Sequence, residues 1–127
     1  MILVTGATGK VGSEAVRLLR RRELPVRALV REASNEVFVS VAALLEIAVK
    51  VGAEKLVLDV REVAEHLIAQ RYRLLGVTVE HAVVLARLPR HHRDPFDRLI
   101  AAQALEDGLT VVTRDPAFAA FGCKVLW

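Results

Sequence analysis

The chain has 127 residues and a mass of 14.0 kDa, which is enough for one hydrophobic core and too little for two ordinary domains, so we expect a single domain over residues 1–127. Hydrophobic residues make up 54% of the chain, but no apolar run approaches the roughly 20 residues of a membrane span. The net charge of +3 arises in the opening segment, where residues 1–33 hold seven Lys/Arg and three acids. The start lacks the order of a signal peptide and the single Cys123 cannot form an internal disulfide, so we predict a soluble protein that contacts no membrane and lies in the cytoplasm.

The first half of the chain predicts strands alternating with helices. Residues 2–5, ILVT, form a short apolar run that ends at a glycine, and apolar residues at helical spacing follow in SEAVRLLRRR. The β-rich EVFVS at 36–40 ends in Ser40, a good N-cap for a helix that stops near Gly52. A further helix is predicted within VREVAEHLIAQRYRLLG, residues 60–76.

The second half has clearer boundaries. VTV at 77–79 leads into a short helix closed by Pro89, and the polar loop RHHR follows. The next helix, DPFDRLIAAQALEDG, has Asp94 as its N-cap, Pro95 at its first position and Gly108 as its stop. A strand LTVVT, a turn RDPAFAAFG and a closing strand KVLW complete the chain.

This alternation predicts the α/β class, with a mainly parallel sheet and helices on both faces. Right-handed crossovers then bring the carboxyl ends of the strands to one edge, where Thr5, Ser40 and the TRD at 113–115 belong. In open α/β sheets the ligand site lies at this edge, at the point where the strand order reverses.

Acids near that edge are the strongest chemical signal. Carboxylates that converge repel one another unless a divalent cation joins them, and oxygen ligands suit Mg²⁺ or Mn²⁺. Such a cation activates water and clamps a phosphodiester. Three of the acids also fit helix-capping or helix-dipole roles. The fourth lies in the almost wholly apolar AALLEIAVKVG, so it faces a partner, a metal or a costly desolvation. The four acids are Glu46, Asp94, Asp97 and Asp115.

Three stretches, NEVFVSVAALLEIAVKVG, VEHAVVLARLPRHHRDPFDRLIAAQALEDGLTVVTRDPAF and VLW, resemble the PIN domain, specifically the VapC-type toxin ribonucleases of bacterial toxin–antitoxin modules. The resemblance covers residues 34–127 and implies a three-layer α/β/α, Rossmann-like fold with strand order 3-2-1-4-5. It implies Mg²⁺ or Mn²⁺ bound by Glu46, Asp97 and Asp115, with Asp94 as an accessory acid. The implied activity is metal-dependent endonucleolytic cleavage of RNA, restrained by a cognate antitoxin, commonly in a homodimer.

The chain departs from this family at the first strand. Family members carry an aspartate there as the first metal ligand, whereas ILVTGATG places Thr5 at that position. A neutral hydroxyl removes one full charge from the site, so we predict weak metal binding and impaired catalysis.

Residues 1–32 instead resemble the first βαβ unit of NADP-binding Rossmann proteins of the atypical short-chain dehydrogenase, NmrA-like type. TGATGKVG supplies glycines for a tight turn and a close approach to a pyrophosphate, and a basic residue after the second strand favours a 2′-phosphate. These residues are Gly6, Gly9, Gly12 and Arg31. Because Gly76 stands where a YxxxK pair beginning at Tyr72 needs a lysine, we favour a purely structural strand–turn–helix over NADP binding.

The two resemblances together predict a chimera with a junction near residues 32–35, a Rossmann-derived part at 1–33 and a PIN-derived part at 34–127. Both parts cannot place a second strand beside the first. We therefore expect residues 24–33 to be helical or irregular, with an antiparallel hairpin of 26–30 against 36–40 as the alternative.

Three functions stay open at this point: an impaired ribonuclease, an inactive chimeric or designed scaffold or interaction module, and an NADP-binding protein. In the first, basic residues guide RNA phosphates, namely Arg93, Arg98 and Arg20 to Arg22. In the second, apolar residues form a dimer surface unless the core buries them, namely Leu44, Leu45, Val83 and Val84. His91 and His92 are expected to be loop residues rather than catalysts.

Overall fold

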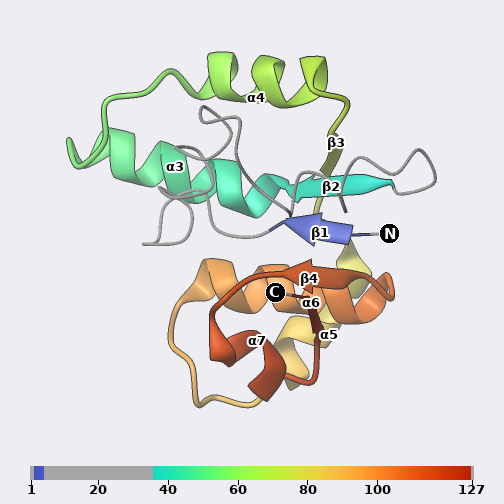
Figure 1. Ribbon diagram of the computed structural model, residues 1–127. Coiled ribbons are helices and arrows are strands. Elements are labelled where there is room, and N and C mark those ends of the chain that lie inside the picture. Colours follow the sequence, from blue (N-terminus) through green and yellow to red (C-terminus); the bar gives the residue numbers. More distant parts are fainter. Residues whose placement is uncertain (1, 5–35, 127) are drawn as a thin grey trace.

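The computed structural model describes residues 2–4 and 36–126, and its strands there form one parallel sheet (Figure 1). The strand order is β3-β2-β1-β4-β5, which confirms the predicted order and the α/β class. The strands are β1 (Ile2–Val4), β2 (Val37–Ser40), β3 (Arg73–Leu75), β4 (Thr110–Val112) and β5 (Lys124–Leu126).

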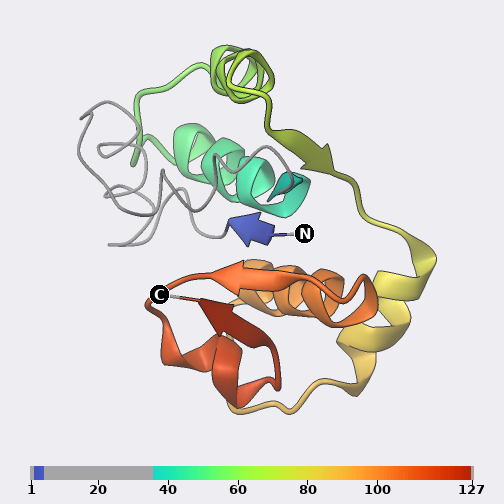
Figure 2. The same cartoon turned by 45° about the vertical axis from the view of Figure 1, so that its right-hand side comes forward.

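The helices of the described residues fall into two groups. In both views, α3 and α4 lie beside β2 and β3, while α5, α6 and α7 gather beside β4 and β5 (Figures 1 and 2). None of these helices is both long enough and apolar enough to cross a bilayer. The helices are α3 (Val41–Gly52), α4 (Val60–Ala69), α5 (Val79–Arg87), α6 (Pro95–Glu106) and α7 (Pro116–Ala120).

The register of the sheet sets where a site can form. Leu3 of β1 pairs with Phe38 of β2 on one side and with Val111 of β4 on the other, so the three strands end together at one edge. The chain proceeds outward from β1 to β2 and β3 and then returns to the opposite side of β1 at β4. The strand order therefore reverses between β1 and β4, and in open α/β sheets the carboxyl ends of the strands at such a point are where ligands bind.

Side-chain caps fix where the helices near this edge begin. The hydroxyl of Ser40 accepts a hydrogen bond from the amide of Ala42 at the start of α3. The carboxylate of Asp94 does the same for the first amides of α6. These contacts satisfy amides that have no partner within the helix, so they confirm both predicted N-caps.

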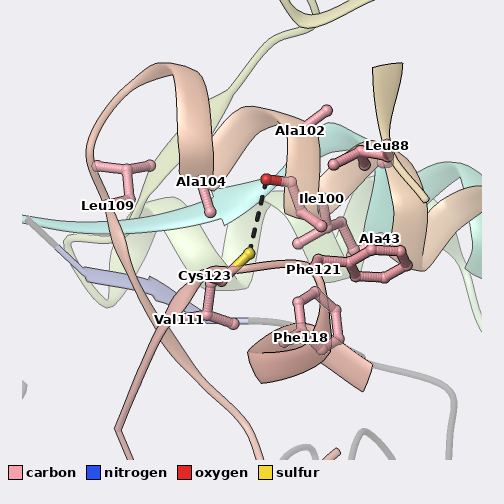
Figure 3. Packing of buried hydrophobic residues seen from close by; sticks show 12 residues of the cluster. Ala43, Leu88, Ile100, Ala102, Ala104, Leu109, Val111, Phe118, Phe121 and Cys123 are labelled. Atoms are coloured by element: carbon pink, nitrogen blue, oxygen red, sulfur yellow. Dashed lines mark hydrogen bonds between the residues drawn. The ribbon is translucent and has the colours of Figure 1, made fainter. Parts of the chain in front are cut away.

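Two hydrophobic clusters lie on opposite faces of β2, because adjacent side chains of a strand point to opposite sides. Val39 belongs to a cluster with Leu44, Ile47 and Leu67, which seats α3 and α4. Phe38 packs against the larger cluster. This cluster joins α5, α6, β4 and α7 (Figure 3). Its buried members are Ala42, Ala43, Leu88, Ile100, Ala101, Ala102, Ala104, Leu109, Val111, Phe118, Phe121 and Cys123.

A buried polar bridge connects the helices on the two sides. The hydroxyl of Ser40 donates to the side-chain oxygen of Gln103 on α6, and neither residue is exposed. The amide nitrogen of Gln103 donates in turn to the carbonyl oxygen of Gly76, 2.9 Å away, and more weakly to that of Leu75. One side chain therefore ties the start of α3, the middle of α6 and the segment after β3.

The predicted helix over residues 60–76 is wrong in its second half. The helix α4 ends at Ala69, Arg71 adopts a positive φ of 65°, and Arg73–Leu75 form β3 at the edge of the sheet. Pairing of Phe38 with Arg73 and of Ser40 with Leu75 draws this segment into the sheet. Tertiary pairing thus overrides a helical pattern that is only local.

Several predictions lie outside the described residues. They concern Thr5, the glycines of TGATGKVG, Arg31 and the path of residues 24–33.

Candidate metal centre

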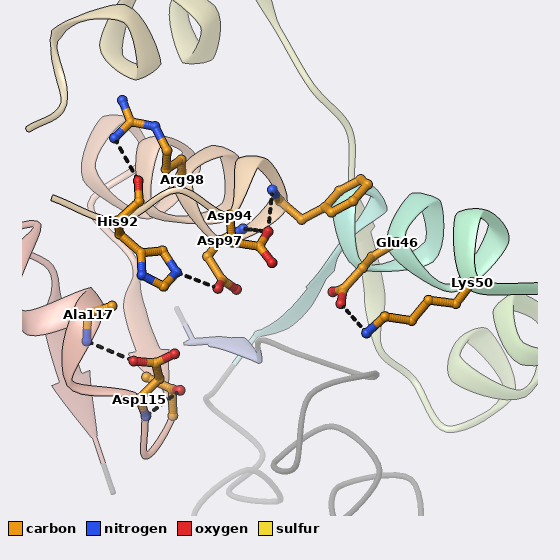
Figure 4. A network of polar contacts seen from close by, with 10 residues as sticks. Glu46, Lys50, His92, Asp94, Asp97, Arg98, Asp115 and Ala117 are labelled. Atoms are coloured by element: carbon orange, nitrogen blue, oxygen red, sulfur yellow. Dashed lines mark hydrogen bonds and ion pairs between the residues drawn. The ribbon is translucent and has the colours of Figure 1, made fainter. Parts of the chain in front are cut away.

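Two of the predicted acids converge at the edge where the strand order reverses. Asp97 lies in the first turn of α6, and Asp115 follows β4 and caps α7. Together with His92 they form a group whose potential ligand atoms all lie within 4.8 Å of one another (Figure 4). The fold therefore brings Asp97 together with Asp115, which lies 18 residues further along the chain.

The electrostatics of Asp97 favour a cation. Burial raises the pKa of this carboxyl group, and the negative charges of Asp94 and Asp115 act in the same direction. A hydrogen bond from the ring of His92 opposes them, with Nε2 at 2.9 Å from Oδ2 of Asp97. An ionised carboxylate in this place is poorly solvated and repelled by its neighbours, which a bound cation would relieve.

Asp94 and Asp115 also serve as helix caps. Oδ1 of Asp94 accepts from the amides of Phe96 and Asp97, at 2.9 and 3.3 Å, and Oδ1 of Asp115 accepts from the amide of Ala117 at 2.8 Å. Each cap occupies one carboxylate oxygen in a defined direction. A carboxylate has a second oxygen, so capping and metal binding are compatible.

Glu46 stands apart from this group in the described residues. It is buried to 9% exposure on α3, and its Oε1 lies 2.7 Å from Nζ of Lys50 one turn further along the helix. In Figure 4 the side chain of Glu46 extends from α3 in the direction of the Asp97 carboxylate. The ion pair resolves the desolvation cost that the sequence predicted for this glutamate, and it supplies a partner that is not a metal.

His92 is a member of the group that the sequence interpretation passed over. It is a loop residue, as expected, but its position two residues before the N-cap of α6 lets it fold back onto the first turn. Arg98 is also placed differently from its predicted role in guiding RNA. Its guanidinium donates to backbone carbonyls at the end of α5 and in the loop before α6, so it is engaged by the protein's own backbone. These carbonyls belong to Leu85, Leu88, Pro89 and His92.

The predicted dimer surface divides between core and exterior. Leu44 is buried and Val84 packs against the larger cluster, whereas Leu45 and Val83 are 48% and 44% exposed. Two of these four side chains therefore pack within the protein, and the other two remain exposed.

The residues present fit a divalent cation. Two carboxylates and one imidazole within 4.8 Å of one another are a donor set that divalent ions accept, and the neighbouring Asp94 adds negative charge. The arrangement lies at the carboxyl edge of a parallel sheet and is 23–29% exposed at the side chains of Asp97 and His92, so a ligand can reach it.

The chain also matches the model of a known protein family. The model described as the PIN domain matches residues 13–122. This match begins well before residue 34, so it extends across the predicted junction near residues 32–35 and gives the chimera no support.

Solved structures with this fold cover nearly the whole chain. One is VapBC from Salmonella typhimurium bound to DNA, with a TM-score of 0.70 and 19% identity over 99% of this chain and 98% of that one. FitAcB from Neisseria gonorrhoeae has a TM-score of 0.65 and 22% identity over 100% and 97%. VapBC2 from Rickettsia felis, bound to a promoter DNA fragment, has a TM-score of 0.62 and 17% identity over 99% and 98%. At these identities the likeness is one of fold.

A short similarity connects the chain to a different protein. An NAD(P)H azoreductase from Xenophilus azovorans is 62% identical over 35 residues, which make up 28% of this chain and 12% of the azoreductase. The chain therefore spans a small fraction of that enzyme.

Proposed function

Because the chain belongs to the PIN domain family, we propose that it is a metal-dependent endoribonuclease of the toxin–antitoxin type, with an impaired active site. The observation that carries this proposal is the convergence of Asp97 and Asp115 at the edge of the sheet where the strand order reverses. The fold shared with VapBC and FitAcB structures supports the toxin–antitoxin type.

Each acid has a separate part in the proposed site. Asp97 and Asp115 hold the cation. Glu46, on α3, completes the ligand set by giving up its ion pair with Lys50 and binding the cation instead. Asp94 adds negative charge beside Asp97 while its capping bonds fix the first turn of α6. When bound, Mg²⁺ or Mn²⁺ supplies activation of water and neutralisation of charge on the phosphodiester.

The proposed impairment follows from Thr5. This residue comes directly after β1 in the sequence, where the resemblance to VapC-type toxins calls for an aspartate. Cation affinity at such sites depends on the number of charged ligands, so a neutral hydroxyl leaves the ion weakly held.

Restoring a negative charge at position 5 tests both the proposed ligand set and the proposed impairment. We expect Thr5→Asp to raise Mn²⁺ affinity, measured by calorimetry, and cleavage of a fluorescently labelled single-stranded RNA by about tenfold or more. Thr5→Asn is the matched control, because it has a similar size to aspartate without its charge. Asp97→Asn should abolish both binding and cleavage. If Thr5→Asp changes neither quantity, the proposed ligand set is wrong.

We further propose an antitoxin as protein partner and a homodimer as the assembled state. The exposed Leu45 and Val83 are apolar residues that such contacts would cover. Light scattering of the purified chain tests the dimer, and a monomer at micromolar concentration would contradict it.

NADP binding is the second candidate function, and the short similarity to the azoreductase is the observation in its favour. It predicts that NADP raises the melting temperature and that Gly9→Val removes this effect. An unchanged melting temperature at millimolar NADP would exclude it.

A further inference from the structure

The loop between α5 and α6 contributes an imidazole to the group of acids. Nε2 of His92 lies 2.9 Å from Oδ2 of Asp97, and both belong to the group whose ligand atoms lie within 4.8 Å of one another. The His92 ring is about as exposed as Asp97, at 29% against 23% for the side chains. His92 therefore occupies the site itself rather than the surface outside it.

The protein holds this loop in place. The guanidinium of Arg98 donates to the carbonyl oxygens of Leu85 and Leu88, at 3.4 and 3.2 Å, and also to those of Pro89 and His92. A single side chain thus binds the backbone on both sides of the turn out of α5. The position of His92 is accordingly set before any ligand arrives, which lowers the cost of binding one.

An aromatic residue of the core fixes the ring as well. The centroid of the Phe121 ring lies 4.9 Å from that of His91, which stacks on it, and 5.9 Å from that of His92, which meets it edge-on. Arg98 lies over the same ring at 5.9 Å. Because Phe121 is buried, this packing anchors the loop to the larger hydrophobic cluster.

The chemistry of the donor set points to a particular class of ion. Mg²⁺ prefers oxygen ligands and retains its waters, whereas imidazole suits Fe²⁺, Ni²⁺, Cu²⁺ and Zn²⁺, and the affinity of a site with mixed nitrogen and oxygen ligands rises from Mn²⁺ through Fe²⁺ to Co²⁺. We propose that His92 is a direct ligand alongside Asp97 and Asp115 and that the site selects a divalent transition-metal ion over Mg²⁺. This inference rests on the metal site of the proposed function, and it adds a ligand and an ion preference.

Binding requires a change of tautomer. Nε2 of His92 now faces a carboxylate, which only accepts hydrogen bonds, so Nε2 carries the hydrogen. Coordination uses the lone pair of Nε2, so the hydrogen of the neutral ring then resides on Nδ1.

The alternative role for His92 is orientation of Asp97 from outside the ligand set. Removing such an outer residue weakens all ions in proportion, whereas removing a nitrogen ligand weakens transition-metal ions more than Mg²⁺. The ratio of affinities therefore separates the two roles.

Binding of Mn²⁺, Co²⁺ and Mg²⁺ to the intact chain provides the test, in titration calorimetry and in pulsed electron paramagnetic resonance of the Mn²⁺ complex. We expect the unaltered protein to bind Mn²⁺ at least about tenfold more tightly than Mg²⁺ and to show nitrogen coupling to the bound Mn²⁺. His92→Asn should remove the coupling and most of the preference. His66→Asn, which removes an imidazole on α4 outside this group, should leave both unchanged.

The outcomes distinguish this inference from the proposed function. If Asp97→Asn abolishes Mn²⁺ binding but the unaltered protein shows no nitrogen coupling, His92 is not a ligand and the carboxylate site stands. If Asp97→Asn leaves Mn²⁺ binding unchanged, the whole site is wrong. Circular dichroism checks that each variant is folded, and His92→Gln repeats the test if His92→Asn is not.

Discussion

Asp94 is one carboxylate with two effects that can be separated. Its capping bonds to the amides of Phe96 and Asp97 are geometric and need only an oxygen acceptor. Its effect on the pKa of Asp97 is electrostatic and needs the negative charge. Serine caps a helix almost as well as aspartate but is neutral, so it retains the first effect and loses the second.

We therefore predict that Asp94→Ser leaves the free energy of unfolding within about 0.5 kcal/mol of the original, while Asp94→Ala lowers it by about 1 kcal/mol. Both variants should bind Mn²⁺ more weakly, because both lack the charge. Urea denaturation and calorimetry measure the two quantities. Full Mn²⁺ affinity in Asp94→Ser would show that Asp94 is a cap alone.

Cys123 illustrates how burial controls a reactive group. Its thiol faces the carbonyl oxygen of Ala101 at 3.8 Å inside the larger cluster (Figure 3), and burial raises its pKa from 9.0 to about 11. The thiol of the unfolded chain ionises first as the pH rises. The stability gained by keeping the folded thiol neutral is therefore present below pH 9.0 and is lost as the pH rises toward 11.

Two measurements check this prediction for Cys123. A thiol reagent near neutral pH should label the folded protein far more slowly than the urea-unfolded protein. The free energy of unfolding should also fall less steeply in Cys123→Ala than in the original chain between pH 9.0 and 11. Equal slopes would contradict the assigned burial.

At the scale of elements, the buried hydrogen bond between Gln103 and Ser40 connects α6 to the start of α3. Gln103→Leu preserves the approximate volume but leaves the hydroxyl of Ser40 and the carbonyl of Gly76 without this partner in a buried place. We predict a loss of about 1–3 kcal/mol in the free energy of unfolding, measured in urea.

A double-mutant cycle isolates the bridge between Ser40 and Gln103. Because the two side chains share one hydrogen bond, the double variant Ser40→Ala, Gln103→Leu should lose less than the sum of the single variants. Strictly additive losses would show that the bridge contributes nothing to stability.

The limits of each element were predictable where the signal was local. Ser40 and Asp94 cap helices through contacts two and three residues away, and Gly108 ends α6 with a φ of 65° that glycine adopts easily. The end of α4 was not predictable in this way. Arg71 takes a similar φ of 65° without being a glycine, and β3 is defined by its pairing with β2, which is distant in sequence.

The same distinction between local signals and long-range contacts applies to the candidate site. Asp97 and Asp115 could be placed together because Asp115 follows β4 and the helix that leads into β4 begins at the same carboxyl edge of the sheet, which is a property of the fold class. His92 could not, since its position depends on the contacts of Arg98 and Phe121 with the loop. The ion pair of Glu46 with Lys50 is a local spacing of four residues that the sequence contained.

For the molecule as a whole, a half-buried acidic site costs stability until a cation binds. Asp97→Asn removes an ionised group that burial and two neighbouring charges disfavour. We predict that this variant is more stable than the original by about 0.5–2 kcal/mol without metal, as measured in urea with a chelator present.

The same variant should lose the gain in stability that a ligand confers. At about 100 times its Kd, Mn²⁺ should add about 2.7 kcal/mol to the original chain and nothing to Asp97→Asn. A variant that is less stable without metal would indicate that Asp97 serves the fold rather than the site.

The outer strands of the described sheet, β3 and β5, have three residues each. An unpaired border this brief offers another polypeptide only a few backbone donors and acceptors, which discourages the open-ended stacking that leads to aggregation. We therefore expect a protein partner to gain little by extending the sheet and to be recognised instead through side chains on the surrounding helices.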